Sequence, residues 1–66
     1  MTAAPLRSRW RTTIMYAEAS YDVRDSAAIE PDGAAAEHLE LWRFAGRSGA
    51  DILELRVVAV HREAAA

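Results

Sequence analysis

Apolar and polar residues alternate along three segments of this chain, at 10–23, 37–45 and 51–62. The last segment, which contains DILELRVV, alternates most regularly and is rich in valine, so it predicts a β-strand. The first segment holds threonine, isoleucine, tyrosine and valine, which favour a second strand because branched and aromatic side chains fit a pleated surface. A helix that aligns Trp10, Ile14 and Tyr21 on one side is the alternative for that segment.

The middle segment fits two structures. As a helix, 34–45 begins after the turn signal Pro31-Asp32-Gly33, with Asp32 as a possible cap and Gly46 as a possible end. As a strand, 37–45 pairs with 51–62 across a turn at 46–49.

The strand alternative gives a consistent hairpin register. It sets apolar pairs against each other on one side and Glu40 against Arg56 on the other, and such pairs stabilise a sheet by roughly 0.2–1 kcal/mol each. A slip of one residue destroys this match. The pattern therefore favours a mainly β fold, a small three-stranded antiparallel meander, with α+β and residues 34–45 helical as the alternative.

The predicted organisation is one small domain at 9–63, with a flexible N-terminal tail at 1–8 and a C-terminal tail at 64–66. A single sheet of this kind has apolar side chains on both sides and no second layer to cover them. Sheets bury an apolar face against another layer. The pattern therefore predicts a partner, either a second copy of the chain or a larger protein subunit.

Composition supports the prediction of a partner chain, because it leaves few other ways to stabilise the fold. A chain of 66 residues buries too little surface to be more than marginally stable alone, and without cysteine it has no disulfide. All eight basic residues are arginine and the net charge is −2, which disfavours a nucleic-acid partner. No apolar run is long enough for a membrane span, and the start of the chain lacks the apolar region of a secretory signal, so we expect a cytoplasmic protein.

Residues that could carry chemistry are few. The serines stand outside any nucleophile motif, and the Gly-bearing segment AGRSGAD does not match a phosphate-binding loop. His38 and His61 fall on opposite sides of the predicted hairpin, so no metal site is predicted, nor any cofactor. A ligand pocket, if oligomerisation completes one, would use aromatic and polar groups of the sheet: Tyr16, His38, Glu40, Trp42 and Phe44.

The N-terminal RSRWR is the most distinctive local motif. If it is extended, three arginines project to one side and Trp10 to the other, which suits docking on an acidic partner surface because Trp and Arg dominate interface hot spots. Nucleic-acid binding through this arm is a further alternative. The candidate interface residues are Arg7, Arg9, Trp10, Arg11, Trp42, Phe44, Val58 and Val60.

The stretch LWRFAGRSGADILELRV, 41–57, resembles the closing hairpin of nuclear transport factor 2-like (SnoaL-like) domains. There an aromatic-rich strand runs through a Gly-bearing turn into a final strand of alternating Leu and Val. The resemblance covers the C-terminal half of such a domain and implies a strand at 37–45. It assigns no functional residue here, because the N-terminal helices that close the pocket in that family have no counterpart in this sequence.

The sequence therefore predicts a non-catalytic interaction module, either a small homo-oligomer or the accessory subunit of a larger complex. A small-molecule-binding or enzymatic domain with a pocket completed by oligomerisation is the first alternative. Nucleic-acid binding through the arginine-rich arm is the second.

Overall fold

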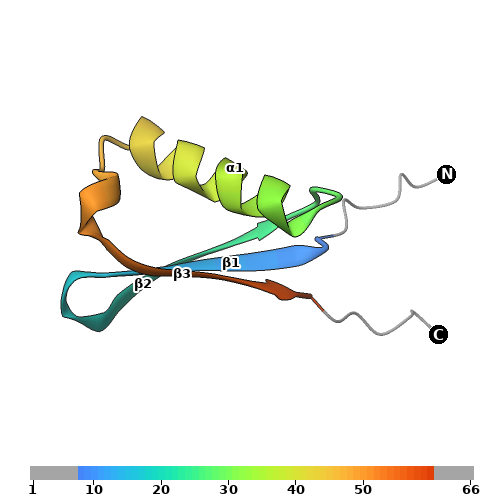
Figure 1. The fold of residues 1–66 in the computed structure, drawn as a ribbon, viewed down its shortest axis with the longest axis horizontal. Coiled ribbons are helices and arrows are strands. Elements are labelled where there is room, and N and C mark those ends of the chain that lie inside the picture. Colours follow the sequence, from blue (N-terminus) through green and yellow to red (C-terminus); the bar gives the residue numbers. More distant parts are fainter. Residues whose placement is uncertain (1–7, 61–66) are drawn as a thin grey trace, which may run out of the picture.

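The computed structural model describes residues 8–60 and places one helix across a three-stranded antiparallel sheet (Figure 1). The elements are β1 (Trp10–Tyr16), β2 (Ser20–Ser26), α1 (Pro31–Phe44) and β3 (Ile52–Ala59), with short 3-10 turns at Ala17–Ala19 and Gly49–Asp51. The strand order is β2-β1-β3. A small, mainly β domain with three antiparallel strands is thus confirmed. Apart from Ser8, the predicted tails lie outside the described residues.

The predicted first strand, 10–23, is two strands. The chain turns back at Ala17–Ala19, so that β2 pairs with β1 in a register that runs from Trp10 opposite Ser26 to Tyr16 opposite Ser20. Ala19 has a φ of 60°, in the left-handed region that a three-residue hairpin loop requires. The alternation continues through this turn, and for that reason the pattern alone did not reveal the break.

The middle segment is helical, so the strand predicted at 37–45 is wrong and the helical alternative for 34–45 is the one observed. Pro31 occupies the first helical position, where its missing N–H costs nothing, and Asp32 lies in the first turn, where a negative charge is favourable. Three consecutive alanines follow, and alanine has the highest helix propensity. The predicted pairing of Glu40 with Arg56 does not form.

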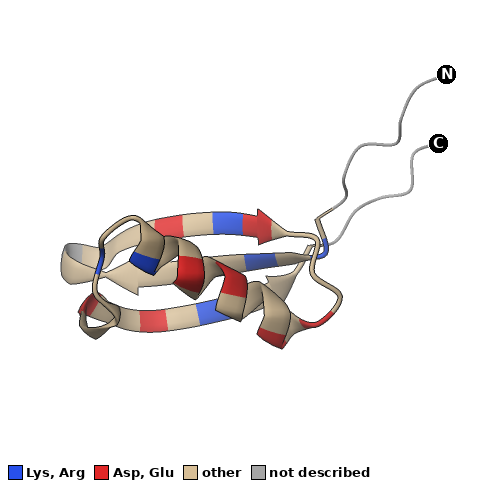
Figure 2. Ribbon diagram, turned by 90° about the horizontal axis from the view of Figure 1, so that it is seen from above, with Lys and Arg blue, Asp and Glu red and all other residues tan. Residues whose placement is uncertain are grey.

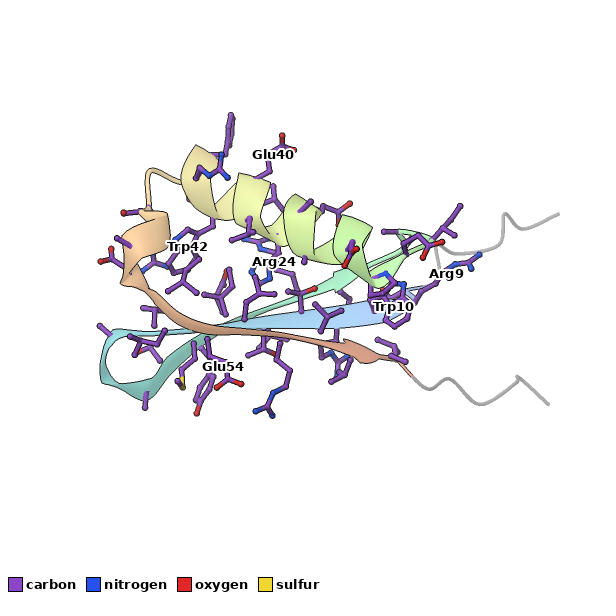
Figure 3. The ribbon with its side chains drawn as sticks, viewed as in Figure 1. Arg9, Trp10, Arg24, Glu40, Trp42 and Glu54 are labelled. Atoms are coloured by element: carbon purple, nitrogen blue, oxygen red, sulfur yellow. The ribbon has the colours of Figure 1, made fainter. Side chains whose placement is uncertain are left out.

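The buried residues of α1 explain why the helix prevails over the strand. Ala34, His38 and Trp42 are buried and lie four residues apart, which is the spacing of one helical stripe. In a strand, the same three residues would share one side with Glu40 between them. The helix instead turns Glu40 to solvent, as Figure 3 shows.

Gly46 ends the helix, as the helical alternative predicted. The N–H of Gly46 donates to the carbonyl of Arg43 at 2.8 Å, and the N–H of Arg47 donates to the carbonyl of Trp42 at 3.1 Å. These two bonds form a Schellman motif, which requires a left-handed residue after the helix; Gly46 has a φ of 83°.

The third strand lies where the sequence predicted it, although it is shorter and has a different partner. β3 pairs with β1, with Thr12 opposite Val57 and Ile14 opposite Leu55. The register shifts at the end of β1, where Tyr16 faces Ile52, so Leu53 falls out of the ladder and is exposed. Residues 37–45 were expected to pair with β3, but most of them belong to α1. β1 pairs with β3 instead and is the central strand of the sheet.

The core lies between α1 and β1 and is small. Among the described residues, the fully buried hydrophobic side chains are Ile14, Ala34 and Trp42. Thr12, Ser26 and His38 are buried with them, so polar side chains form a large part of the interior. No helix in the described part of the chain is long and apolar enough to cross a membrane.

Gly46→Ala should lower the free energy of unfolding by about 1–2 kcal/mol, because a Cβ disfavours the left-handed conformation. Beyond Gly46 and its two chain neighbours, no heavy atom lies within 4 Å of the added Cβ, so the loss comes from the backbone conformation. Urea denaturation measures it. Gly49→Ala is the matched control: its surroundings are equally open, its φ is not positive, and we expect no loss. Equal losses at both glycines would contradict the Schellman geometry.

Candidate functional site

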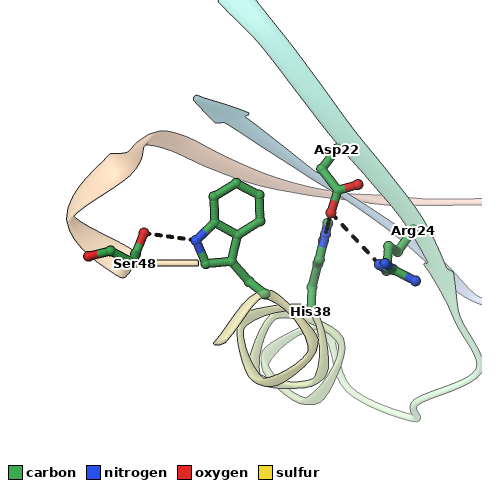
Figure 4. Close-up of polar contacts among 5 residues, drawn as sticks. Asp22, Arg24, His38 and Ser48 are labelled. Atoms are coloured by element: carbon green, nitrogen blue, oxygen red, sulfur yellow. Dashed lines mark hydrogen bonds and ion pairs between the residues drawn. The ribbon is translucent and has the colours of Figure 1, made fainter. Parts of the chain in front are cut away.

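A buried histidine joins the helix to the edge of the sheet. His38 is 1% exposed, and its Nε2 lies 2.9 Å from Oδ2 of Asp22 on β2 (Figure 4). An ionised carboxylate only accepts hydrogen bonds, so the proton of this bond belongs to Nε2. Nε of Arg24 lies 3.8 Å from the same carboxylate oxygen. The three side chains form a polar cluster at the boundary between α1 and β2.

Simple periodicities bring this cluster together. Asp22 and Arg24 are two residues apart on β2, so both point to the face that α1 covers. His38 lies one turn after Ala34 and one turn before Trp42, and it therefore points to the same interior. The sequence analysis selected His38 but missed Asp22 and Arg24. The helical alternative for 34–45 contained the signal, because a histidine in the buried stripe of a helix requires a polar partner.

A groove of about 320 Å³ lies beside this cluster. Its lining comes from α1 and β2, with one residue from β1: Thr12, Val23, Arg24, Asp25, Ser26, Ala34, Glu37, His38 and Leu41. Ser26 Oγ accepts a hydrogen bond from the N–H of Ala28 at 3.0 Å. Two other buried polar atoms of the lining residues have no hydrogen-bond partner, Thr12 Oγ1 and His38 Nδ1. Both atoms are closed to solvent, so they lie beneath the surface of the groove rather than on it.

An imidazole held by a carboxylate can accept and return a proton at its second nitrogen. The polar lining residues that are exposed are Arg24, Asp25 and Glu37. In the described part of the chain, no group of three or more His, Cys, Asp or Glu side chains could hold a metal ion. His61 lies outside the described residues.

An aromatic cluster locks the other end of the helix onto the sheet. The rings of Tyr16 and Trp42 meet edge to face, with centroids 5.2 Å apart. The guanidinium of Arg47 lies 4.5 Å from the Tyr16 ring centre and 4.3 Å from that of Trp42, within the range of cation–π attraction. Trp42 Nε1 donates to the carbonyl of Ser48 at 2.8 Å (Figure 4). These contacts satisfy the polar atom of a buried indole and fill the space around it.

The predicted ligand residues separate into two groups. Tyr16 and Trp42 are in contact, and His38 lies one turn before Trp42 on the same inner stripe. Glu40 and Phe44 lie on the solvent side of α1, where Phe44 is 90% exposed. The helix separates the two groups because residues two positions apart point in different directions around it.

The predicted interface residues are also dispersed. Trp10 is half-buried, and its Nε1 donates to the carbonyl of Ile29 at 3.4 Å. Val60 is half-buried, and its N–H donates to the carbonyl of Arg9 at 2.8 Å. Arg9 and Val58 are exposed, Trp42 is buried in the core, and Arg7 lies outside the described residues.

Arg11 forms a two-pronged ion pair across the strands. Its Nε and Nη2 donate to the two carboxylate oxygens of Asp25 at 2.7 and 3.0 Å. The hydrogen bond and the charge of Asp25 raise the pKa of Arg11, which is charged in any case. This arginine is therefore already neutralised within its own chain.

The comparisons provide no relative. No protein family, curated protein or solved structure gives a significant match to this chain. The resemblance to the closing hairpin of nuclear transport factor 2-like domains does not extend to the structure, because 41–44 is the end of α1 and β3 pairs with β1. The function must therefore be inferred from the molecule itself.

Asp22→Ala should lower the free energy of unfolding by about 1–3 kcal/mol, because it leaves His38 Nε2 buried without its partner. Asp22→Asn keeps a carbonyl oxygen at this position and should recover part of the loss. Glu40→Ala removes an exposed carboxylate on the outer side of α1, and we expect a change within about 0.5 kcal/mol. Chemical denaturation at neutral pH compares the three variants. An Asp22→Ala variant as stable as Glu40→Ala would show that the hydrogen bond contributes nothing.

Proposed function

We propose that this protein is a non-catalytic interaction module that works as a homodimer, joined through the face of the sheet that α1 leaves uncovered. We call this the open face. Strand alternation assigns it the residues Arg11, Thr13, Met15, Tyr21, Val23, Asp25, Glu54, Arg56 and Val58. The observation that supports the proposal is the single layer of cover: the helix crosses one face of the sheet, and no described element crosses the other (Figure 1).

The composition of the open face suits an interface. Tyr21, Val23 and Val58 are 61%, 52% and 46% exposed, and Met15 lies half-buried on β1 between the two edge strands. A sheet normally buries such a face against a second layer. The three hydrophobic side chains that are fully buried in the described part of the chain are few for an independent core. Association of two copies would bury the apolar side chains of the open face.

The charges of the open face favour a second copy of the same chain. Arg11 pairs with Asp25, and Arg56 pairs with Glu54 at 2.9 Å, so the face has no net charge. Figure 3 shows Glu54 on the side of the sheet away from the helix. Two such faces can meet around a two-fold axis without repulsion between the copies.

The outer side of the helix is a poorer candidate for self-association. Its exposed residues include the carboxylates of Asp32 and Glu40, and Figure 2 shows acidic positions in red along α1. Two copies that met along this side would bring like charges together. The exposed apolar residues at its end are Phe44 and Leu41, and charged Glu40 and Arg43 line the same shallow hollow, so the apolar area there is small.

The accessory-subunit alternative would use the same open face with a different partner. A nucleic-acid role has less support, since Asp25 already neutralises Arg11. A cytoplasmic location stays a prediction.

Light scattering with size-exclusion chromatography should give the mass of a dimer at micromolar concentration. The melting temperature should rise with protein concentration, because dissociation accompanies unfolding of a dimer. A stable monomer with a concentration-independent melting temperature would rule out the homodimer.

The surface that joins the copies can be identified by charge insertion. A double variant, Tyr21→Lys plus Val58→Lys, places unpaired charges on the open face at two positions that are already exposed, so we expect it to fold and to be monomeric. The matched control, Phe44→Lys, changes a more exposed residue on the opposite side of the molecule and should remain dimeric. Loss of the dimer in the control alone would place the interface on the helix.

A further inference from the structure

We propose that the free edge of β3 pairs, in antiparallel register, with β3 of a second copy of the chain, in a contact separate from the open face. β3 is the last strand in the order β2-β1-β3, so within residues 8–60 no strand lies on its outer side. The edge of a sheet presents N–H and C=O groups that another strand can satisfy. This pairing joins two sheets edge to edge, and it does not require the open-face homodimer.

The pairing of β3 with β1 shows which backbone groups lie on the free edge. The N–H of Val60 donates to the carbonyl of Arg9, on the side of β1. Successive residues of an antiparallel strand direct their backbone groups alternately to one side and the other, and the register between the two strands is regular as far as Glu54. Leu55, Val57 and Ala59 therefore direct their N–H and C=O groups outward, away from β1.

The sequence of β3 is complementary to itself about Leu55. An antiparallel pair centred on Leu55 sets this residue opposite its copy and sets Glu54 opposite Arg56 of the second copy, twice by symmetry. These charged residues would occupy the non-hydrogen-bonded positions of the new ladder, where facing side chains lie closest and opposite charges are favourable. A pair centred on Arg56 would set two arginines against each other, and one centred on Val57 would leave both charges opposite valines.

Apolar side chains beside the edge also favour this contact. Leu55 lies opposite the buried Ile14, on the side of the sheet that α1 covers, yet Leu55 and Val57 are only half-buried. Leu53 is 63% exposed and would lie opposite Val57 of the second copy. A second β3 would cover these side chains from the edge, where the helix does not reach, and burial of apolar surface is favourable.

β2, the other edge strand, is less suited to such pairing. Three of its seven residues are charged, against two of eight in β3, and charged side chains protect an edge strand from pairing. Its charges also have partners within the chain, since Asp22 bonds to His38 and Asp25 pairs with Arg11. The two charges of β3 match a second copy of the same strand.

The contact is small, because the register shift near the start of β3 limits regular pairing to a short stretch. Interfaces of small area are generally weak and transient. We therefore expect the edges to pair at protein concentrations well above the micromolar range in which the open face acts.

Amide hydrogen exchange of the ¹⁵N-labelled full-length chain, compared at micromolar and near-millimolar concentration, tests the pairing. The N–H groups of Leu55 and Val57 should exchange at least about tenfold more slowly at the higher concentration, because they become hydrogen-bonded. Tyr21 and Val23 are the control, since by the same alternation their N–H groups lie on the free edge of β2 and should not change. Exchange at Leu55 and Val57 that is independent of concentration, or equal slowing at both edges, would overturn the proposal.

Charge reversal tests the register. Glu54→Arg sets like charges opposite each other and should abolish the concentration-dependent protection. Glu54→Arg plus Arg56→Glu restores opposite charges within the chain and across the contact, and it should restore the protection. Glu40→Arg, which changes the net charge equally on the outer side of α1, is the matched control and should keep it. The indole N–H resonance of Trp42 reports whether each variant is folded, and full protection in folded Glu54→Arg would contradict the register.

The two measurements keep the edge contact and the open-face homodimer apart. The mass at micromolar concentration reports the open face, whereas amide exchange at Leu55 and Val57 reports the edge. A micromolar dimer without edge protection would overturn the edge contact alone. Edge protection in a chain that is monomeric at micromolar concentration would support the edge contact and overturn the homodimer.

Discussion

One helix has to cover a sheet of three strands, and the rest of the molecule depends on this constraint. α1 crosses a single face and presents Ala34, His38 and Trp42 to it, one residue per turn. The stripe is narrow, so the buried hydrophobic core is limited to a few side chains. Everything that the helix does not reach remains as surface, and this includes a sheet face with tyrosine, valine and methionine side chains.

Directional contacts partly replace apolar packing in this interior. His38 occupies the middle of the helical stripe and meets Asp22 through a hydrogen bond, which has a preferred geometry, whereas apolar contact has none. At the C-terminal end, Trp42 meets Tyr16, Arg47 and the carbonyl of Ser48. The two anchors lie one turn apart on α1 and reach different parts of the chain. Together they fix the rotation of the helix on the sheet, where a few apolar contacts would specify it less well.

The sequence predicted best the strand whose structure depends least on its neighbours in the fold. The alternation at 51–62 belongs to a true strand because β3 is covered on one side, whichever strand lies beside it. The hairpin turn at Ala17–Ala19 was missed because it contains no Gly, Pro, Asn or Asp, and Ala19 nevertheless adopts a left-handed conformation. Asp22 and Arg24 were missed for the same reason, since the turn is what places them opposite α1. Within the groove, His38 was the residue that sequence reasoning selected, as one of the two histidines of the chain.

The amino-acid sequence by itself indicated a small, mainly β fold with three antiparallel strands, and without cysteine it excluded a disulfide. It also contained the residue that ends the helix, Gly46, which acts locally through its own backbone preference. The start at Pro31 was missed, because Pro31-Asp32-Gly33 fits a turn as well as a first helical turn. Tertiary structure decided between helix and strand at 37–45. The apolar residues there fit either period, and the choice depends on burying Ala34, His38 and Trp42 together against β1, β2 and β3. It also decided which residues meet at His38, because hydrogen-bond partners distant in sequence follow from strand pairing, and no local pattern records that pairing.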